Sequence, residues 1–202
     1  MQHTIRLLFI AGSAREGSLN KRLARLAHDV AEANGIAATF ADIGDYPMPI
    51  YDGDLEAKDG PPENARKLKA LLEVHQGVLI AAPEYNASLA PLLKNTLDWV
   101  SRVREAGEPP LQVYKTRVFA IAAASPGALG GTRGLIALRQ TLELGLGALV
   151  LPDQLIVPRA GDAFDSHGHL QDKGQMQQLK AVIQRLARAA HIMGGDAVEG
   201  SR

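Results

Sequence analysis

The sequence predicts an α/β fold in which five parallel strands form a doubly wound sheet with helices on both faces. Three observations indicate this fold. Short apolar runs alternate along the chain with segments whose apolar residues recur every three or four positions. The apolar runs are so uniformly hydrophobic that both of their faces must be buried, as in parallel sheets. Right-handed crossovers between such strands favour the strand order 2-1-3-4-5.

In the N-terminal half, strands are expected where aliphatic and aromatic residues run together between turn signals. These runs are 5–11, 36–41 and 77–82. Between them, apolar residues at helical spacing predict a first helix, which carries Leu23, Leu26, Ala27, Val30 and Ala31, and a second helix near 63–75. Residues 47–62 are rich in Pro, Gly and Asp, so a long loop is expected there.

The C-terminal half continues the alternation. Apolar runs predict strands over 116–124 and over 148–157, the second interrupted by Pro152. Helical spacing of apolar residues predicts helices over 89–102, 132–146 and 171–191. A chain of 202 residues favours a single domain, expected here over 1–193, followed by a disordered tail over 194–202.

Composition excludes several functional classes. Lys plus Arg and Asp plus Glu both number 22, so the chain lacks the basic field that would attract nucleic acid or an anionic membrane. The absence of cysteine removes disulfides, thiolate nucleophiles and cysteine-ligated metals. No apolar run approaches the roughly 20 residues of a membrane span, and 1–4 lead directly into the first strand. We therefore expect a cytoplasmic protein whose partner is a small molecule.

The segment after the first strand is expected to bind a phosphate. It reads GSAREGSLN over 12–20 and follows the carboxyl end of a strand, where open α/β sheets bind ligands. The next helix directs its free N–H groups into this loop, and Ser13, Arg15 and Ser18 add donors. Neither a Walker A sequence nor a G-x-G-x-x-G sequence is present, so a mononucleotide fits best. In the alternative interpretation, Ser18 is only an N-cap and Arg15 a solvated charge.

Two further loops are expected to meet the phosphate loop at one edge of the sheet, because the strand order reverses there. After the third strand, Pro83 rigidifies a turn that presents backbone N–H groups over 84–86. After the fourth strand, glycines in the loop 125–131 allow the backbone to approach a flat ring closely. A phosphate site with two clamps for a planar heterocycle describes a site for flavin mononucleotide (FMN).

Two separated motifs resemble the NADPH-dependent FMN reductase family, which includes bacterial quinone, azo-dye and chromate reductases. The first motif is G-S-x-R-x-x-S-x-N over 12–20. The second is P-E-Y-N-x-S-x-x-P-x-x-K-N-x-x-D-W-x-S-R over 83–102. The resemblance implies a flavodoxin-like fold, bound FMN, hydride supplied by NADPH or NADH, and assembly into dimers or tetramers.

The resemblance also implies roles for individual residues. The phosphate would be held by Ser13, Arg15, Ser18 and Asn20, the isoalloxazine ring would be lined by Pro83, Glu84, Tyr85 and Asn86, and its other edge would be closed by Ser125 and Gly127. Leu19 and Pro126 complete the expected cofactor-binding set. Ala90 before Pro91, and Ser125-Pro126 before the glycines, depart mildly from the family pattern.

The expected chemistry takes place on the flavin and requires little chemistry from the side chains. The flavin accepts hydride at its own N5 atom, so neither a catalytic triad nor an essential general base is expected. A flat acceptor such as a quinone would then stack in the vacated place, in a ping-pong scheme, with Tyr85 as one wall. Azo compounds, chromate and free flavin are further candidate acceptors. A flavodoxin-type electron carrier and a flavin-sensing module are the alternatives, although the zero net charge disfavours the carrier.

Two other features have simple interpretations. His167-Gly168-His169 has the residue types of a metal site, but without a helical frame it is expected to be a solvated turn. The apolar stripe of the helix over 89–102, which includes Trp99, exceeds the need of one sheet face. It is either ordinary core or a subunit interface, and the resemblance favours the interface, hence a homodimer or homotetramer.

Overall fold

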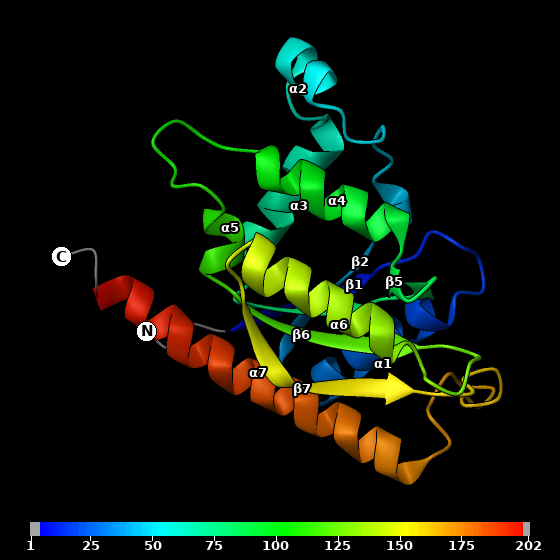
Figure 1. Ribbon diagram of the computed structural model, residues 1–202. Coiled ribbons are helices and arrows are strands. Elements are labelled where there is room, and N and C mark those ends of the chain that lie inside the picture. Colours follow the sequence, from blue (N-terminus) through cyan, green and yellow to red (C-terminus); the bar gives the residue numbers. More distant parts are fainter. Residues whose placement is uncertain (1–4, 200–202) are drawn as a thin grey trace.

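The computed structural model describes residues 5–199, and its centre is one parallel five-stranded sheet (Figure 1). The strands are β1 (Arg6–Ala11), β2 (Ala37–Asp42), β3 (Gly77–Ala81), β6 (Val118–Ala124) and β7 (Leu149–Val157). Their order is β2-β1-β3-β6-β7, and each neighbouring pair is parallel. The predicted doubly wound, flavodoxin-like topology is therefore confirmed.

Helices cover both faces of the sheet. Helices α1 (Leu19–Ala33) and α7 (Lys173–Glu199) lie on one face. Helices α3 (Glu63–Glu73), α4 (Pro91–Arg102), α5 (Gln112–Lys115) and α6 (Thr132–Gln140) lie on the other, and α6 continues into a π-helical turn over Thr141–Gly145. Side chains of β1 alternate between the two layers, with Leu7 and Phe9 facing α1 and α7. The central strands β1, β3 and β6 are buried on both sides, as their uniform hydrophobicity requires, whereas the edge strands β2 and β7 are only partly buried.

Some short elements differ from the expectation. The segment over 47–62 is not entirely a loop, because Asp52 caps a short helix, α2 (Gly53–Asp59). After β3 the chain forms an antiparallel hairpin of two short strands, β4 (Glu84–Tyr85) and β5 (Ser88–Leu89). Leu89 thus belongs to a strand, and α4 begins later, with Pro91 in its first turn.

The C-terminal helix is longer than the sequence predicts. A glycine pair at 194–195 suggests an end to the helix, yet α7 continues to Glu199. Glycine lowers helix stability by only about 1 kcal/mol and does not block backbone hydrogen bonds, so the pair does not force a stop. The last part of the expected tail, 200–202, lies outside the described residues.

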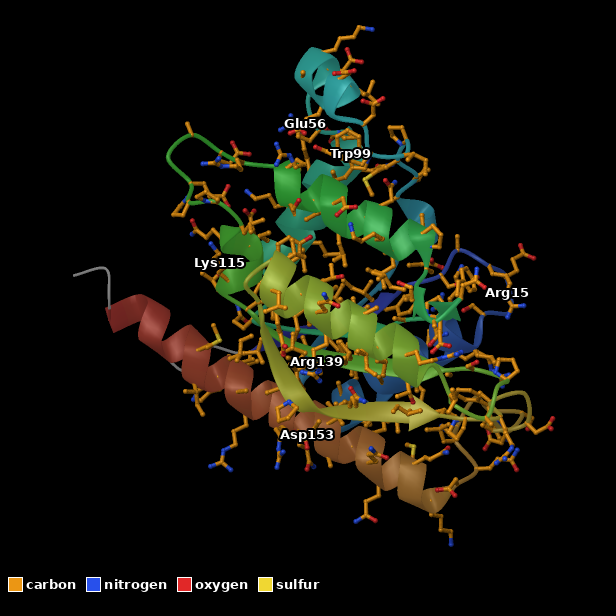
Figure 2. All side chains as sticks on the ribbon, viewed as in Figure 1. Arg15, Glu56, Trp99, Lys115, Arg139 and Asp153 are labelled. Carbon is orange, nitrogen blue, oxygen red and sulfur yellow. The ribbon has the colours of Figure 1, made fainter. Side chains whose placement is uncertain are left out.

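The apolar stripe of α4 belongs to the core of the chain itself. Leu93, Leu97 and Val100 are buried against the sheet, and Trp99 is completely inaccessible. The Trp99 indole donates a hydrogen bond of 2.7 Å to the Pro49 carbonyl, where the segment that carries α2 meets α4 (Figure 2). The interpretation of this stripe as a subunit interface is therefore wrong, because packing within the chain already buries it. No helix within 5–199 combines the length and the hydropathy needed to cross a bilayer.

Candidate functional site

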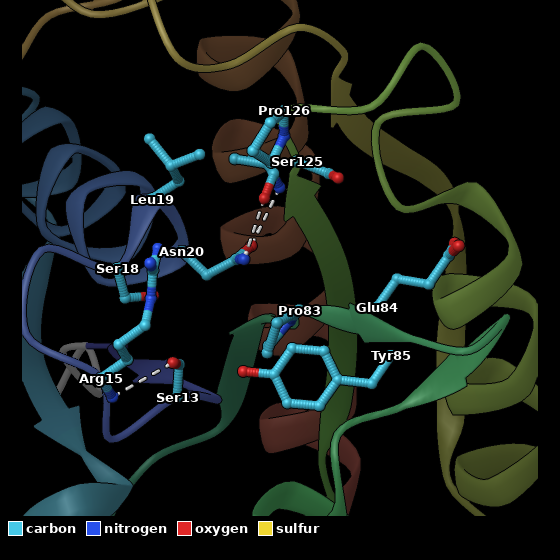
Figure 3. Close-up of a pocket in the computed structure, with 11 residues that line it drawn as sticks. Ser13, Arg15, Ser18, Leu19, Asn20, Pro83, Glu84, Tyr85, Ser125 and Pro126 are labelled. Atoms are coloured by element: carbon cyan, nitrogen blue, oxygen red, sulfur yellow. Dashed lines mark hydrogen bonds between the residues drawn. The ribbon is translucent and has the colours of Figure 1, made fainter.

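A cavity of about 200 Å³ opens where the loops after β1, β3 and β6 meet, at the carboxyl edge of the sheet (Figure 3). Its lining consists of Ser13, Arg15, Ser18, Leu19, Asn20, Pro83, Glu84, Tyr85, Ala124, Ser125 and Pro126. The structure thus brings together every residue expected at the site except Asn86 and Gly127, and adds Ala124. The reversal of strand order between β2-β1 and β3-β6 creates this opening.

The loop over 12–18 offers uncommitted hydrogen-bond donors. Ser13 and Ser18 are buried, and each hydroxyl oxygen accepts one long bond of 3.4 Å, from the amides of Arg15 and Lys21 respectively. Neither hydroxyl proton has an acceptor among the described residues. Ser18 is indeed the N-cap of α1, but this role uses its oxygen as acceptor and leaves its proton available.

The N-terminus of α1 points its unpaired amides toward the same region. Within 5–199, the N–H groups of Leu19 and Asn20 donate to no backbone or side-chain oxygen. Such groups, together with the helix dipole, favour a negative charge. Arg15 is exposed, and its guanidinium forms neither a hydrogen bond nor an ion pair within the described chain. In Figure 3 its side chain extends beside Ser18 at the cavity.

Asn20 has a different position from the other loop residues. Its buried side chain forms two hydrogen bonds with the main chain of Ala124, through Nδ2 to the carbonyl oxygen (3.0 Å) and from the amide to Oδ1 (2.9 Å). These bonds join the start of α1 to the end of β6. Asn20 therefore fixes the spacing of two cavity loops, and its carbonyl oxygen and one amide proton are already used.

Glu84 lines the cavity with its backbone, while its side chain points away toward α6 (Figure 3). The carboxylate accepts hydrogen bonds from Arg133 Nε (2.9 Å) and from the Gly134 amide (3.0 Å). Burial alone would raise the pKa of Glu84, but the Gly134 amide and the Arg133 guanidinium outweigh it and lower the pKa below its ordinary value. Glu84 is thus an anion that holds the hairpin against the N-terminal end of α6.

The β4–β5 hairpin places the ring of Tyr85 over the cavity. The two residues between the strands, Asn86 and Ala87, both have positive φ, 50° and 63°, as a type I′ turn requires. Asn86 is exposed at the tip of this turn, which explains why it does not line the cavity. The Tyr85 side chain remains half exposed, and Figure 3 shows its ring projecting from the hairpin toward the loop of Ser13 and Arg15.

The third loop is supported by the segment that follows β7. Ala160 donates its amide to the Ser125 carbonyl (2.9 Å), and Arg159 donates to the Gly127 carbonyl (3.1 Å). The Gly127 amide donates to Ser125 Oγ (3.2 Å). Gly127 therefore shapes the loop without lining the cavity. Sequence reasoning missed this support because no local motif marks 158–160.

Two groups with metal-ligating residue types lie elsewhere. Asp165 accepts the backbone amides of His167 and His169 at 2.8 and 2.9 Å, so this segment is a turn organised by a carboxylate. On the outer surface of α1, ligand atoms of His28, Asp29 and Glu32 come within 4.8 Å of one another, but both carboxylates are exposed to solvent. Neither group is part of the cavity lining.

Comparison with known proteins agrees with this geometry. The family model for NADPH-dependent FMN reductase matches residues 5–162. An NAD(P)H-dependent FMN reductase of Pseudomonas aeruginosa is 34% identical over 194 residues, covering 92% of this chain and 99% of that protein. A quinone reductase of Escherichia coli is 31% identical over 198 residues, covering 92% of this chain and 99% of that protein.

Among solved structures, FerB of Paracoccus denitrificans, a flavoenzyme NAD(P)H:(acceptor) oxidoreductase, is similar over nearly its whole length. It superposes with a TM-score of 0.75 at 25% identity, covering 94% of this chain and 98% of that one. The match of the family model includes all three loops that form the cavity. The chain therefore belongs to the NADPH-dependent FMN reductase family.

Proposed function

We propose that the cavity binds FMN and that the protein transfers hydride from NADPH or NADH, through this FMN, to a flat acceptor such as a quinone. The observation that carries the proposal is the two-part character of the cavity. One end presents donors and an unpaired cation, and the other presents flat or apolar side chains. A phosphate monoester attached to a planar heterocycle has the same two parts.

The polar end fits the phosphate. The hydroxyls of Ser13 and Ser18 and the first amides of α1 would donate to the phosphate oxygens, and Arg15 would supply charge-assisted bonds. Asn20 would act indirectly, by fixing the loop through Ala124. This role differs from the direct phosphate contact implied by the motif.

The other end fits the ring. Pro83, Tyr85 and Pro126 line it with apolar surface, and the backbone over 124–126 is held by Asn20 and by the segment after β7. Bound FMN supplies the redox chemistry, accepting hydride from the nicotinamide and returning two electrons to an acceptor. The chain's own task is to bind and orient, because Glu84, the one carboxylate in the lining, is committed to Arg133 and Gly134.

Donor and acceptor would use one opening in turn, which is a ping-pong scheme. The half-exposed Tyr85 ring forms a wall against which a nicotinamide or a flat acceptor can stack. Leu129, in the third loop, is 54% exposed and adds apolar surface to that loop. A quinone suits such an opening, and azo compounds, chromate and free flavin are the other acceptors that the proposal admits.

Anaerobic mixing of the FMN-loaded protein with NADPH or NADH tests this function. We expect the nucleotide to bleach the visible flavin absorbance and a stoichiometric quinone to restore it. Steady nucleotide oxidation with excess quinone would exclude an electron carrier and a flavin sensor. A flavin that remains oxidised with both nucleotides would contradict the proposal.

The proposal includes self-association, through a face that differs from the buried stripe of α4. An open groove runs between α4 and α6, and its lining includes Lys94, Asp98 and Leu144. Leu144 and Ile136 on this side of the molecule are 82% and 62% exposed, which is unusual for large apolar residues. A second copy covering this groove would bury them. Light scattering of Leu144→Glu should report a smaller species than wild type, whereas Ile192→Glu, an exposed position on α7, should not.

A further inference from the structure

We propose that Lys21 is a positioning residue that holds the phosphate loop in its binding conformation. The inference rests on the proposed FMN site. Lys21 lies in the first turn of α1, and its Nζ donates to the Ala14 carbonyl at 3.1 Å. The same Nζ lies 2.6 Å from Asp42 Oδ2. One ammonium group thus joins the loop after β1, the start of α1 and the end of β2.

The contact is sheltered on the side away from the cavity. The side chains of Lys21 and Asp42 are only 19% and 11% exposed, so the pair is partly shielded from water and salt. Asp42 is itself oriented, because its Oδ1 accepts the Gly44 amide at 2.9 Å. At Gly44 a Cβ atom would come within 3.1 Å of the Ala14 Cα, so the backbone after β2 packs directly against the loop.

The Lys21 bond sets the direction of one amide in the loop. A peptide group is planar and trans, so the N–H of Arg15 points opposite to the carbonyl of Ala14. Lys21 draws that carbonyl toward Asp42. The Arg15 N–H is thereby directed to the opposite side, where Ser13 Oγ lies at 3.4 Å and lines the cavity. A rotation of this peptide would remove a donor from the proposed phosphate site.

Helix stability alone does not explain a lysine at this position. A cation in the first turn interacts unfavourably with the helix dipole, and no acidic residue in that turn compensates for it. The compensating charge comes instead from Asp42 at the end of β2. The amide that Lys21 orients faces Ser13 in the proposed phosphate site. The effect of Lys21 should therefore depend on the phosphate of the ligand.

Comparison of FMN with riboflavin, which lacks the phosphate, tests this inference. The full chain, stripped of flavin, is titrated with each ligand, and thermal unfolding verifies the fold of every variant. Lys21→Met should weaken FMN binding by at least about tenfold and change riboflavin binding less than about twofold. Lys21→Arg should restore most of the FMN affinity. Lys58→Met, on the exposed α2, is the matched control and should affect neither ligand.

Asp42→Asn provides a second variant with almost unchanged volume, and it should also weaken FMN more than riboflavin. An equal loss of affinity for both ligands in these variants would show that Lys21 only stabilises the fold, and would overturn the inference. Unchanged FMN affinity would overturn it as well. A wild-type chain that binds FMN no better than riboflavin would instead contradict the proposed phosphate site, so the two failures are distinguishable.

Discussion

The side-chain amide of Asn20 is paired with the main chain of Ala124, a residue 104 positions later, through bonds of 3.0 and 2.9 Å. The pair joins α1, after β1, to the end of β6, although β3 lies between these two strands in the sheet. It therefore spans the edge of the sheet at which the cavity opens. Asn20 thus links the first loop directly to the end of β6, where the third loop begins.

Asn20→Ala should destabilise the protein and weaken its binding of every flavin. The change leaves the buried amide and carbonyl of Ala124 without their partners, which costs about 1–3 kcal/mol of unfolding free energy. Urea denaturation measures the loss. Asn64→Ala removes an exposed bond to the Pro47 carbonyl and should cost less. Equal stability of wild type and Asn20→Ala would contradict the role given to Asn20.

Arg15→Ala should reduce FMN affinity without affecting the fold. The guanidinium has no hydrogen-bonding partner within 5–199, so its removal breaks no internal contact. A lost charge-assisted bond is worth roughly 1.5–3 kcal/mol, or about 10- to 100-fold in the dissociation constant. Fluorescence titration with FMN and riboflavin measures it. Equal FMN affinity of wild type and variant would show that Arg15 is only a solvated surface charge.

Trp99→Phe should lower the free energy of unfolding by roughly 1–3 kcal/mol while the oligomeric state in solution stays the same. Trp99 is fully buried, and its indole bond to Pro49 holds the segment before α2. Trp99→Glu would place an unpaired charge in the core and should prevent folding. Circular dichroism and light scattering on the same samples check both outcomes. A folded Trp99→Glu monomer would support the interface interpretation instead.

Because of His75, the free energy of unfolding should decrease in mild acid. Its imidazole is buried, and it contacts the Leu71 carbonyl through Nδ1 (2.6 Å) and Thr39 Oγ1 through Nε2 (2.8 Å). Burial lowers the pKa of His75 below its ordinary 6.5, so the folded chain binds fewer protons than the unfolded chain. The contribution of neutral His75 to the free energy of unfolding is therefore fully present above the pKa of His75 in the unfolded chain. It is lost as the pH falls through the pKa of His75 in the folded chain.

Urea denaturation of wild type and His75→Gln between about pH 7.5 and 5 measures this effect, with exposed His191→Gln as the control. The variant should show a flatter dependence of stability on pH. The same slope in His75→Gln and wild type would show that other groups cause the acid sensitivity.

The sheet order and the three cavity loops were predictable because their signals are local. Buried parallel strands appear as continuous apolar runs, and the loop over 12–20 has its donors within one short segment. Topology then places Ser13, Pro83 and Ser125 at one edge, where the cavity is found. These inferences needed no knowledge of side-chain partners.

Features that depend on distant partners were not predictable. The motif makes Asn20 a phosphate residue, whereas its amide is paired with Ala124, and Glu84 is directed outward by Arg133. The apolar residues of α4 outnumber those that one sheet face can bury, because the segment around Pro49 also packs against this helix and covers Trp99. The sequence gives no local sign of that contact. In each of these cases the outcome depends on a contact between residues far apart in the sequence. Local periodicity does not reveal such contacts.

Identification of the flavin released from the purified protein tests the central claim most directly. The account predicts FMN, at one molecule per chain after loading, in preference to FAD, because the loop with Ser13, Arg15 and Ser18 suits a terminal phosphate. Mass analysis of the released cofactor, with absorbance for stoichiometry, gives the answer. Recovery of FAD alone, or failure of the flavin-free chain to bind FMN, would contradict it.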